Sequence, residues 1–447
     1  MLHDHRGLAV STTSAEALAH YETAVAQFHS YRGDPIATLG AALSADESFV
    51  LAHLFKAFAL MTTSEARYLP AARAAVAGAR AGARRANARE RALLAAAGQL
   101  VAGDWHAACR CFDAVLREWP RDAVALQTAH LMDFYRGDAL NLRNRISRVL
   151  PAWSASVPGY SYVLGMHAFG LEECNQYAEA EAAGRRALAI EPTDGWAVHA
   201  VTHVMEMQGR VDEGIQWLTS RSADWATDDN AFAPHNWWHL ALFHMDRGAF
   251  DAALDLYDHR IDGPQADMLL VLVDCTALLW RLQLEGVNVG DRFERVAQRW
   301  QARADEETGH YAFNDFHAML SYAACGRSAD AQHLLASLRT HAVGYGVNAA
   351  KTRDVGLPLS EGVLDFTQGR PERAVERIDA VRDTANAFGG SHAQRDLLTL
   401  TLIAAAMEAG DFSRARHLLA ERQVHKPTTW STRLAARIDA AALPVAA

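Results

Sequence analysis

The chain has 447 residues, of which half are hydrophobic and 21% are charged, a composition typical of a soluble globular protein. The net charge of −10, with no block of lysines and arginines standing out, argues against nucleic acid or a membrane surface as the main partner. No apolar run reaches the roughly 18 residues that a membrane span requires, and no signal peptide is recognisable. The five scattered cysteines contain no CxxC pair, so we expect a cytoplasmic protein with free thiols.

Helices are predicted almost throughout, because apolar residues recur at three- and four-residue spacing and no long alternating pattern indicates a strand. Residues 15–85 fit two degenerate helix pairs, and residues 86–430 contain clearer tetratricopeptide-like repeats. The second helix of each unit is recognised by an anchor residue that packs against the first helix. The anchors are Ala108, Leu142, Ala180, Gly214, Ala253, Ala331, Ala374 and Ala415. Their spacing lies at or above the roughly 34 residues of the tetratricopeptide repeat.

A single helix hairpin cannot bury its apolar face, so neighbouring hairpins stack into a superhelix with a concave wall. We therefore expect an all-α fold, a right-handed α-solenoid, forming one continuous domain over residues 1–447. The segment His341–Pro358 is rich in Gly and Val and carries Arg353. It is predicted to be an irregular, lid-like loop on the concave side, with Arg353 as a ligand-binding candidate.

The histidines of one predicted first helix share a face. In a tetratricopeptide unit the first helix lines the concave wall, and the anchor Gly214 sets the register of this one. Trp196, His199, His203 and Glu206 then point into the groove, because spacings of three and four residues place side chains on one side of a helix.

The stretch PHNWWHLALFHMD begins the next unit and repeats the pattern. His235 and Trp238 face the groove there, with His239 at the edge of the same face, whereas His244 is assigned a packing role. A single inward histidine is more often a core residue than a catalyst. Four histidines and a glutamate on two adjacent helices are harder to explain, because burying them without partners costs several kcal/mol.

Two further polar stretches are ligand-binding candidates. FNDFH places Asn314, Asp315 and His317 early in a helix, although the first two residues are equally suited to starting that helix. In GGSHAQRD, Ser391 is a good helix cap, and Arg395 is able to reach either a carboxylate ligand or a neighbouring acidic side chain.

These motifs resemble the tetratricopeptide repeat protein 38 family. The resemblance rests on HAVTHVMEMQGRVDEGIQWL, PHNWWHLALFHMDRGAFDAALDLYD, FNDFHAML and GGSHAQRDLLTLTLIAAA, and covers roughly residues 160–427. It implies an all-helical repeat fold and supplies no reaction, substrate or cofactor.

Three functions remain open. The first is a small-molecule site with general acid–base chemistry, either hydrolysis or lysis, carried by the histidines and Glu206. The second is a divalent metal bound by the two HxxxH pairs with Glu206. The third is a scaffold that binds a protein or peptide without catalysis.

Overall fold

The computed structural model describes residues 2–443, and these residues form helical hairpins with no strand beyond two isolated bridges. The expected all-α solenoid of tetratricopeptide-like hairpins is confirmed. In the part of the chain that the structure describes, every helix is too short or too polar to cross a bilayer.

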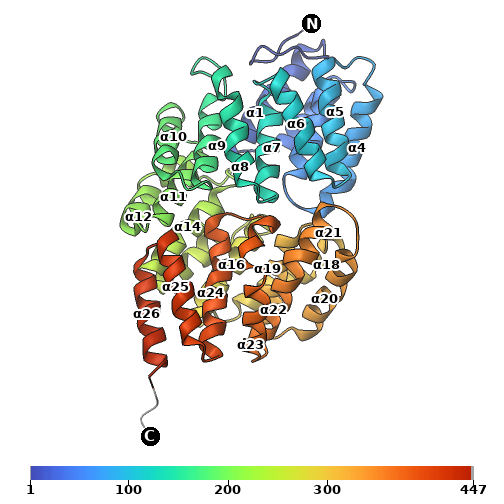
Figure 1. Ribbon diagram of the computed structural model, residues 1–447. Helices are drawn as coiled ribbons and strands as arrows, with labels where there is room; N and C mark the ends of the chain where they lie inside the picture. The colour runs from blue at the N-terminus through green and yellow to red at the C-terminus, as the bar shows by residue number, and fades with distance from the viewer. Residues whose placement is uncertain (1, 444–447) are drawn as a thin grey trace. The chain divides into compact units, whose positions relative to one another are not determined.

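Contacts between Cα atoms divide the chain into two compact units, with the boundary inside helix α11 (Gly195–Met207). Unit 1 comprises the residues up to Val201 together with Ser222–Ala233, and unit 2 comprises Thr202–Arg221 and the residues from Pro234 onward. Figure 1 draws most of unit 1 in blue to green and most of unit 2 in yellow to red. The expectation of one continuous domain stays a prediction.

Unit 1 begins with two helix pairs, α1–α2 and α3–α4, in the region expected to hold two degenerate repeats. Its elements are α1 (Ala15–Ser30), α2 (Pro35–Ala45), α3 (Val50–Met61), η1 (Ala66–Tyr68), α4 (Leu69–Ala81), α5 (Ala88–Val101), α6 (Trp105–Glu118), α7 (Ala123–Tyr135), α8 (Ala139–Val149), η2 (Leu150–Ala152), α9 (Tyr160–Glu172), α10 (Tyr177–Ile190) and α13 (Ser222–Trp225).

Unit 2 continues the hairpin pattern. Its elements are α12 (Val211–Ser220), α14 (Ala233–Asp246), α15 (Phe250–Leu256), η3 (Tyr257–Ile261), α16 (Leu269–Leu284), α17 (Arg292–Gln301), α18 (Ala304–Glu307), α19 (Ala312–Ala324), α20 (Ser328–Ala342), α21 (Val347–Lys351), η4 (Thr352–Gly356), α22 (Leu357–Thr367), α23 (Pro371–Asp379), η5 (Arg382–Phe388), α24 (His392–Glu408), α25 (Phe412–His425) and α26 (Thr429–Ala441).

Aspartates set many of the helix starts. The side chains of Asp104, Asp122 and Asp138 each accept a hydrogen bond from the backbone N–H three residues later, at 2.8 to 3.0 Å. Such caps satisfy one of the backbone donors that a helix leaves unpaired at its first turn. The short polar turns of the sequence therefore define where the hairpins begin.

The anchor residues lie where the second helix of a hairpin approaches its neighbours. Gly214 on α12 faces the ring of Phe243 on α14, and a Cβ atom at Gly214 would lie only 2.2 Å from that ring. Ala253, the next anchor, is fully buried on α15. Small residues at these positions let the helices approach closely, which fixes the register of α11 and α14.

The irregular backbone expected at 341–358 is wrong, whereas the role of this segment as a lid stays a prediction. Helix α20 continues to Ala342, and residues 347–367 are helical, with a π-helical segment at Thr352–Gly356. This segment packs on α19, α20 and η5. Only residues 343–346 interrupt the helices. The Gly and Val content of the segment suggests a loop, although most of its backbone is helical.

Candidate metal centre

Helices α11 and α14 carry the histidines. The side chain of Asp194 caps α11, because its Oδ1 accepts hydrogen bonds from the N–H groups of Trp196 and Ala197 at 3.0 Å. The i, i+4 spacing then places His199 and His203 on one face of α11, one turn apart. The same spacing places His235 and His239 on one face of α14.

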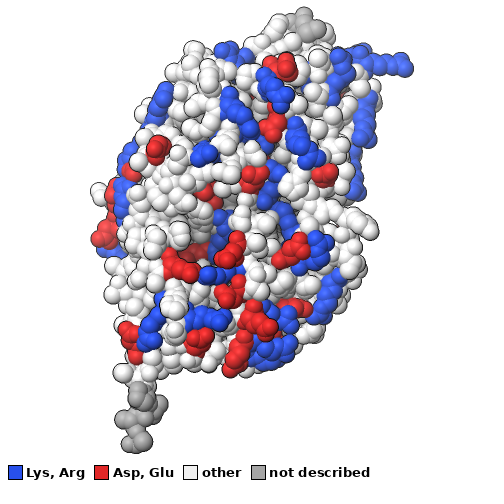
Figure 2. Space-filling model, in the orientation of Figure 1, with Lys and Arg blue, Asp and Glu red and all other residues white. Residues whose placement is uncertain are grey.

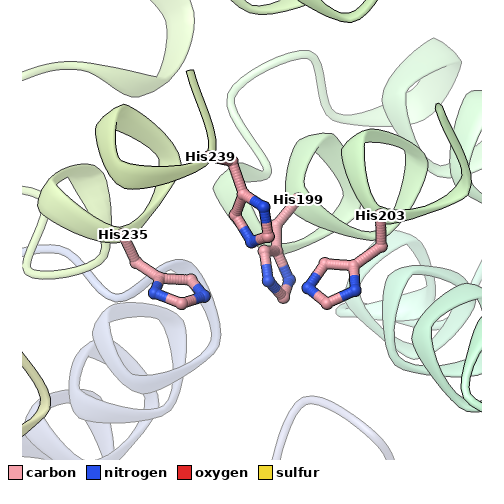
Figure 3. A group of neighbouring side chains, drawn as sticks. All are labelled: His199, His203, His235 and His239. Atoms are coloured by element: carbon pink, nitrogen blue, oxygen red, sulfur yellow. The ribbon is translucent and has the colours of Figure 1, made fainter. Parts of the chain in front are cut away.

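The four imidazoles meet. Each histidine offers a ring nitrogen, and these nitrogens all lie within 4.8 Å of one another. Figure 3 shows the rings of His203, His235 and His239 directed toward one place, with His199 one turn before His203 on α11. His203 and His239 are fully buried, and the side chain of His235 is 16% exposed. The ring centroids of His203 and His239 are 4.5 Å apart.

Two of the rings are oriented by carboxylates. Nδ1 of His239 donates to Oε2 of Glu206 at 2.7 Å, and Nδ1 of His235 donates to Oδ2 of Asp274, also at 2.7 Å. A carboxylate accepts the Nδ1 proton, so in a neutral ring Nε2 carries the lone pair. Hydrogen bonding of this kind typically fixes the tautomer and the ring orientation of metal-ligating histidines.

Glu206 belongs to a buried network of charges within unit 2. Nζ of Lys426 lies 2.5 Å from Oε1 of Glu206 and 3.5 Å from Oδ2 of Asp396. Asp396 in turn accepts two hydrogen bonds from Arg422, at 2.7 and 2.8 Å. Burial would lower the pKa of Lys426, but the carboxylates of Glu206, Asp396 and Asp246 raise it above its ordinary value. Lys426 is therefore a cation beside Glu206.

Burial lowers the pKa of His239 well below its ordinary value, and the neighbouring His203 and His235 lower it further. His239 is consequently neutral at physiological pH, which is the form that binds a metal. The expectation that this histidine exchanges protons near neutral pH is not supported by its surroundings.

A tryptophan contacts a histidine on each of the two helices α11 and α14. The fully buried Trp238 stacks on His235, with ring centroids 5.3 Å apart, and the guanidinium of Arg281 lies 5.4 Å from the Trp238 ring centroid. In unit 1, Trp196 packs against His199 and Phe232 at 5.2 and 5.0 Å. Both tryptophans are thus packing residues that also hold a histidine ring.

The three candidates on α19 lie outside the four-histidine group, and two of them have local partners. Asp315 accepts from the N–H of Gly309 at 3.2 Å, and burial raises its pKa to about 8. His317 donates from Nδ1 to the Phe313 carbonyl at 2.8 Å, and burial lowers its pKa to about 4. Asn314 is buried beside them on α19.

The role of Arg353, Ser391 and Arg395 as ligand-binding residues stays a prediction, and each of them has a partner close by in the sequence. Arg353 is half-exposed and pairs with its neighbour Asp354 at 2.8 Å. Ser391 caps α24 in a capping box with Gln394, and Arg395 donates to the Gly390 carbonyl at the start of the same helix. Each of these side chains thus contributes to the local structure.

Residues that the sequence did not indicate complete the surroundings of the histidines. The sequence contains one hint of Asp274. It is the single charged residue within the apolar run DMLLVLVDCTALLW, apart from the aspartate that begins the run. Arg281, buried on α16, donates to the Ala393 carbonyl at 2.7 Å. Asp396 ends the motif GGSHAQRD, but neither it nor Lys426 was singled out, because the contact between Glu206 and Lys426 joins residues far apart in the sequence.

No known family model matches the chain. Among solved structures it is similar to a human IFIT1 dimer with m7Gppp-AAAA, at 11% identity over 83% of this chain and 89% of that chain, with a TM-score of 0.43. It is also similar to the P58(IPK) TPR domain, at 13% identity over 92% and 99%, with a TM-score of 0.20. A third similar structure is the pentatricopeptide repeat protein PPR10 with an 18-nt psaJ RNA element, at 14% identity over 98% and 70%, with a TM-score of 0.27.

The exclusion of nucleic acid as a partner is corrected by these structures. IFIT1 was solved with m7Gppp-AAAA and PPR10 with an RNA element. The exclusion rested on the net charge of the whole chain, which says nothing about how the charge is distributed over its surface.

Proposed function

We propose that the protein binds a divalent transition-metal ion of the zinc class through His199, His203, His235 and His239. The observation that carries the proposal is the convergence of four imidazole nitrogens within 4.8 Å. Tetrahedral zinc has Zn–N distances of about 2.0 to 2.1 Å, which places ligand nitrogens roughly 3.4 Å apart.

The carboxylates support the metal proposal over general acid–base catalysis. Glu206 and Asp274 hold Nδ1 of His239 and His235, which leaves Nε2 of each ring to act as a ligand. Acid–base catalysis requires a group that titrates near the working pH, whereas burial keeps His239 neutral. Imidazole ligands suit Zn, Cu, Fe and Ni, and zinc favours a tetrahedral site with nitrogen donors.

Metal analysis with histidine variants tests the proposal. The wild-type protein, loaded with Zn²⁺ and dialysed, is expected to retain about one ion per chain. His203→Ala and His239→Ala are expected to lose it. The matched control is His244→Ala, a half-buried histidine on the same helix α14 that belongs to no metal-ligating group. A wild-type protein that retains no ion, or a control that loses as much as the two ligand variants, would rule the proposal out.

A second candidate function is the binding of a peptide by a scaffold without catalysis. The observation that favours it is an apolar cleft of about 270 Å³ in unit 2, lined by Trp280, Leu400, Ile403, Met407 and Trp430 among others. Clefts of this kind accept the apolar face of an amphipathic helix. Ile403→Lys is then expected to abolish peptide binding and leave metal content unchanged, and equal peptide binding by the variant would exclude the cleft.

We infer membership of the tetratricopeptide repeat protein 38 family from the motifs around α11, α14, α19 and α24. The strings HNWWHLAL and GGSHAQRD support it, and the first of them supplies two of the four histidines. A cytoplasmic location is supported by the five cysteines, which are all free.

A further inference from the structure

One face of unit 1 carries many arginines and few carboxylates. Between Ala66 and Val101 the sequence has seven arginines and a single acidic residue, Glu90, in a chain whose net charge is −10. Glu90 is fully buried and accepts hydrogen bonds from the N–H groups of Ser11 and Asn87 at 2.9 and 3.0 Å. Its charge therefore does not offset the arginines at the surface. Figure 2 shows positive side chains along the edge where Figure 1 draws α4 and α5.

Most of these arginines are exposed and form no ion pair with a carboxylate among the described residues. Two of the seven are exceptions, because Arg67 pairs with Glu65 at 2.5 Å and the buried Arg89 pairs with Asp122 at 2.7 Å. We call the other five the arginine face: Arg73, Arg80, Arg84, Arg85 and Arg91.

The members of the arginine face come from one stretch of chain. Arg73 and Arg80 are seven residues apart on α4, which is two helical turns and places them on the same side. Arg84 and Arg85 follow directly after α4, and Arg85 donates to Oγ of Ser48 at 2.7 Å. The face thus runs along α4 and the connection to α5, with Arg91 in the first turn of α5.

Exposed arginines elsewhere in the described chain commonly face a carboxylate. In unit 2, Arg295, Arg339 and Arg416 each donate to a carboxylate at 2.5 to 3.0 Å. Arg85 is an exception within the arginine face, because the carboxylate of Asp46 lies close enough to interact with its charge. Like charges that lack counter-charges, as the other members do, raise the local potential and attract anions. The arginine face is consequently a site for an anion that the chain itself does not supply.

The composition of the face selects the kind of anion. All its cations are arginines, whose planar guanidinium binds phosphate with two parallel hydrogen bonds. No large hydrophobic side chain between Ala66 and Val101 is among the exposed ones. Insertion into a bilayer, stacking on unpaired bases and the apolar centre of a protein interface all need such a side chain.

We propose that the arginine face binds the phosphodiester backbone of a double-stranded nucleic acid without reading its bases. A duplex presents closely spaced phosphates on a regular surface and requires no stacking platform. The affinity arises from the release of counterions, so it falls steeply as the salt concentration rises.

Fluorescence anisotropy with a duplex RNA of about 20 bp, at about 50 mM salt, tests the proposal on the full chain. The triple variant Arg73→Gln, Arg80→Gln, Arg84→Gln is expected to bind at least tenfold more weakly. Its plot of log K against log salt concentration is expected to be shallower by about 2.7, or about 0.9 for each phosphate that an arginine no longer neutralises. A DNA duplex of the same sequence is expected to behave alike, because the bases are not read.

The matched control is the triple variant Arg295→Gln, Arg339→Gln, Arg416→Gln, which changes the net charge equally but removes arginines that are already paired. It is expected to bind as the wild type does. Equal weakening by both triple variants would overturn the proposal, and so would a wild type that does not bind the duplex. Binding of polyglutamate as tightly as the duplex would also overturn it and would indicate an acidic protein as the partner.

Discussion

Nζ of Lys426 lies 2.5 Å from Oε1 of Glu206, while Oε2 of the same carboxylate accepts the Nδ1 proton of His239 at 2.7 Å. A lysine at the end of α25 is thereby connected to a histidine of α14 through a single buried side chain of α11. A buried carboxylate without a cation is costly, so Lys426 offsets the cost of burying Glu206 beside the ring. We therefore assign Lys426 a positioning role for the proposed metal centre.

Lys426→Met is expected to weaken metal binding roughly 10- to 100-fold, the range typical for loss of a group that orients a ligand. The physical reason is that Glu206 loses its cation and no longer holds His239 firmly. Titration with Co²⁺, followed by visible absorption, measures both the affinity and the ligand geometry. Lys426→Arg keeps the charge and is expected to restore most of the affinity, so equal affinities for Met, Arg and wild type would contradict the assignment.

Asp274→Asn tests the second oriented ring. Asn accepts the Nδ1 proton of His235 less strongly than a carboxylate does, so we expect metal affinity to fall by roughly tenfold. Competition with a chelator of known affinity measures the change. Asp262→Asn is the matched control, since that carboxylate pairs with Arg299 at 2.7 Å instead of a histidine. If Asp262→Asn lost more metal affinity than Asp274→Asn, a role of Asp274 in orienting His235 would be excluded.

Gly214→Ala is expected to destabilise the protein by about 1 to 3 kcal/mol, because the added methyl group overlaps the ring of Phe243. Gly40→Ala, on α2, is the comparison variant, because a Cβ atom there meets nothing within 4 Å. We expect it to stabilise the protein by about 0.5 to 1 kcal/mol, since Ala favours a helix more than Gly does. Urea unfolding monitored by circular dichroism compares the two. If both variants shifted stability in the same direction, the close approach of α12 and α14 would not be what Gly214 permits.

Asp315 is expected to make stability depend on pH. Burial raises the pKa of Asp315 to about 8 in the folded chain, from the ordinary value of 3.8. Between these values the unfolded chain loses the proton and the folded chain keeps it, so stability falls as pH rises from about 4 to about 8. Asp315→Asn removes this loss and still offers an oxygen to the N–H of Gly309.

The stability of Asp315→Asn relative to wild type is therefore expected to increase from about pH 4 to about pH 8, as measured by unfolding in urea at several pH values. The control is Asp383→Asn, whose side chain is 89% exposed. A difference between wild type and Asp315→Asn that does not vary with pH would contradict the burial of an uncharged carboxyl group.

The sequence determined those features that depend on spacing within one helix. The four-residue intervals between His199 and His203, and between His235 and His239, define two faces whatever the surroundings, because an α-helix repeats about every 3.6 residues. Small residues at Gly214 and Ala253 indicated where hairpins close. The all-helical fold and the candidate histidines could both be predicted from these local rules.

Only the tertiary structure decided which distant groups complete the site. The contacts of Glu206 with Lys426 and of His235 with Asp274 join residues that are 220 and 39 positions apart, and the local pattern of the sequence specifies neither contact. The irregular backbone expected at His341–Pro358 is wrong for a similar reason, since this glycine-containing segment is helical where it packs on α19 and α20. Helix periodicity operates within a few turns, whereas burial, ion pairing and the exposure of the arginine face depend on which helices pack together.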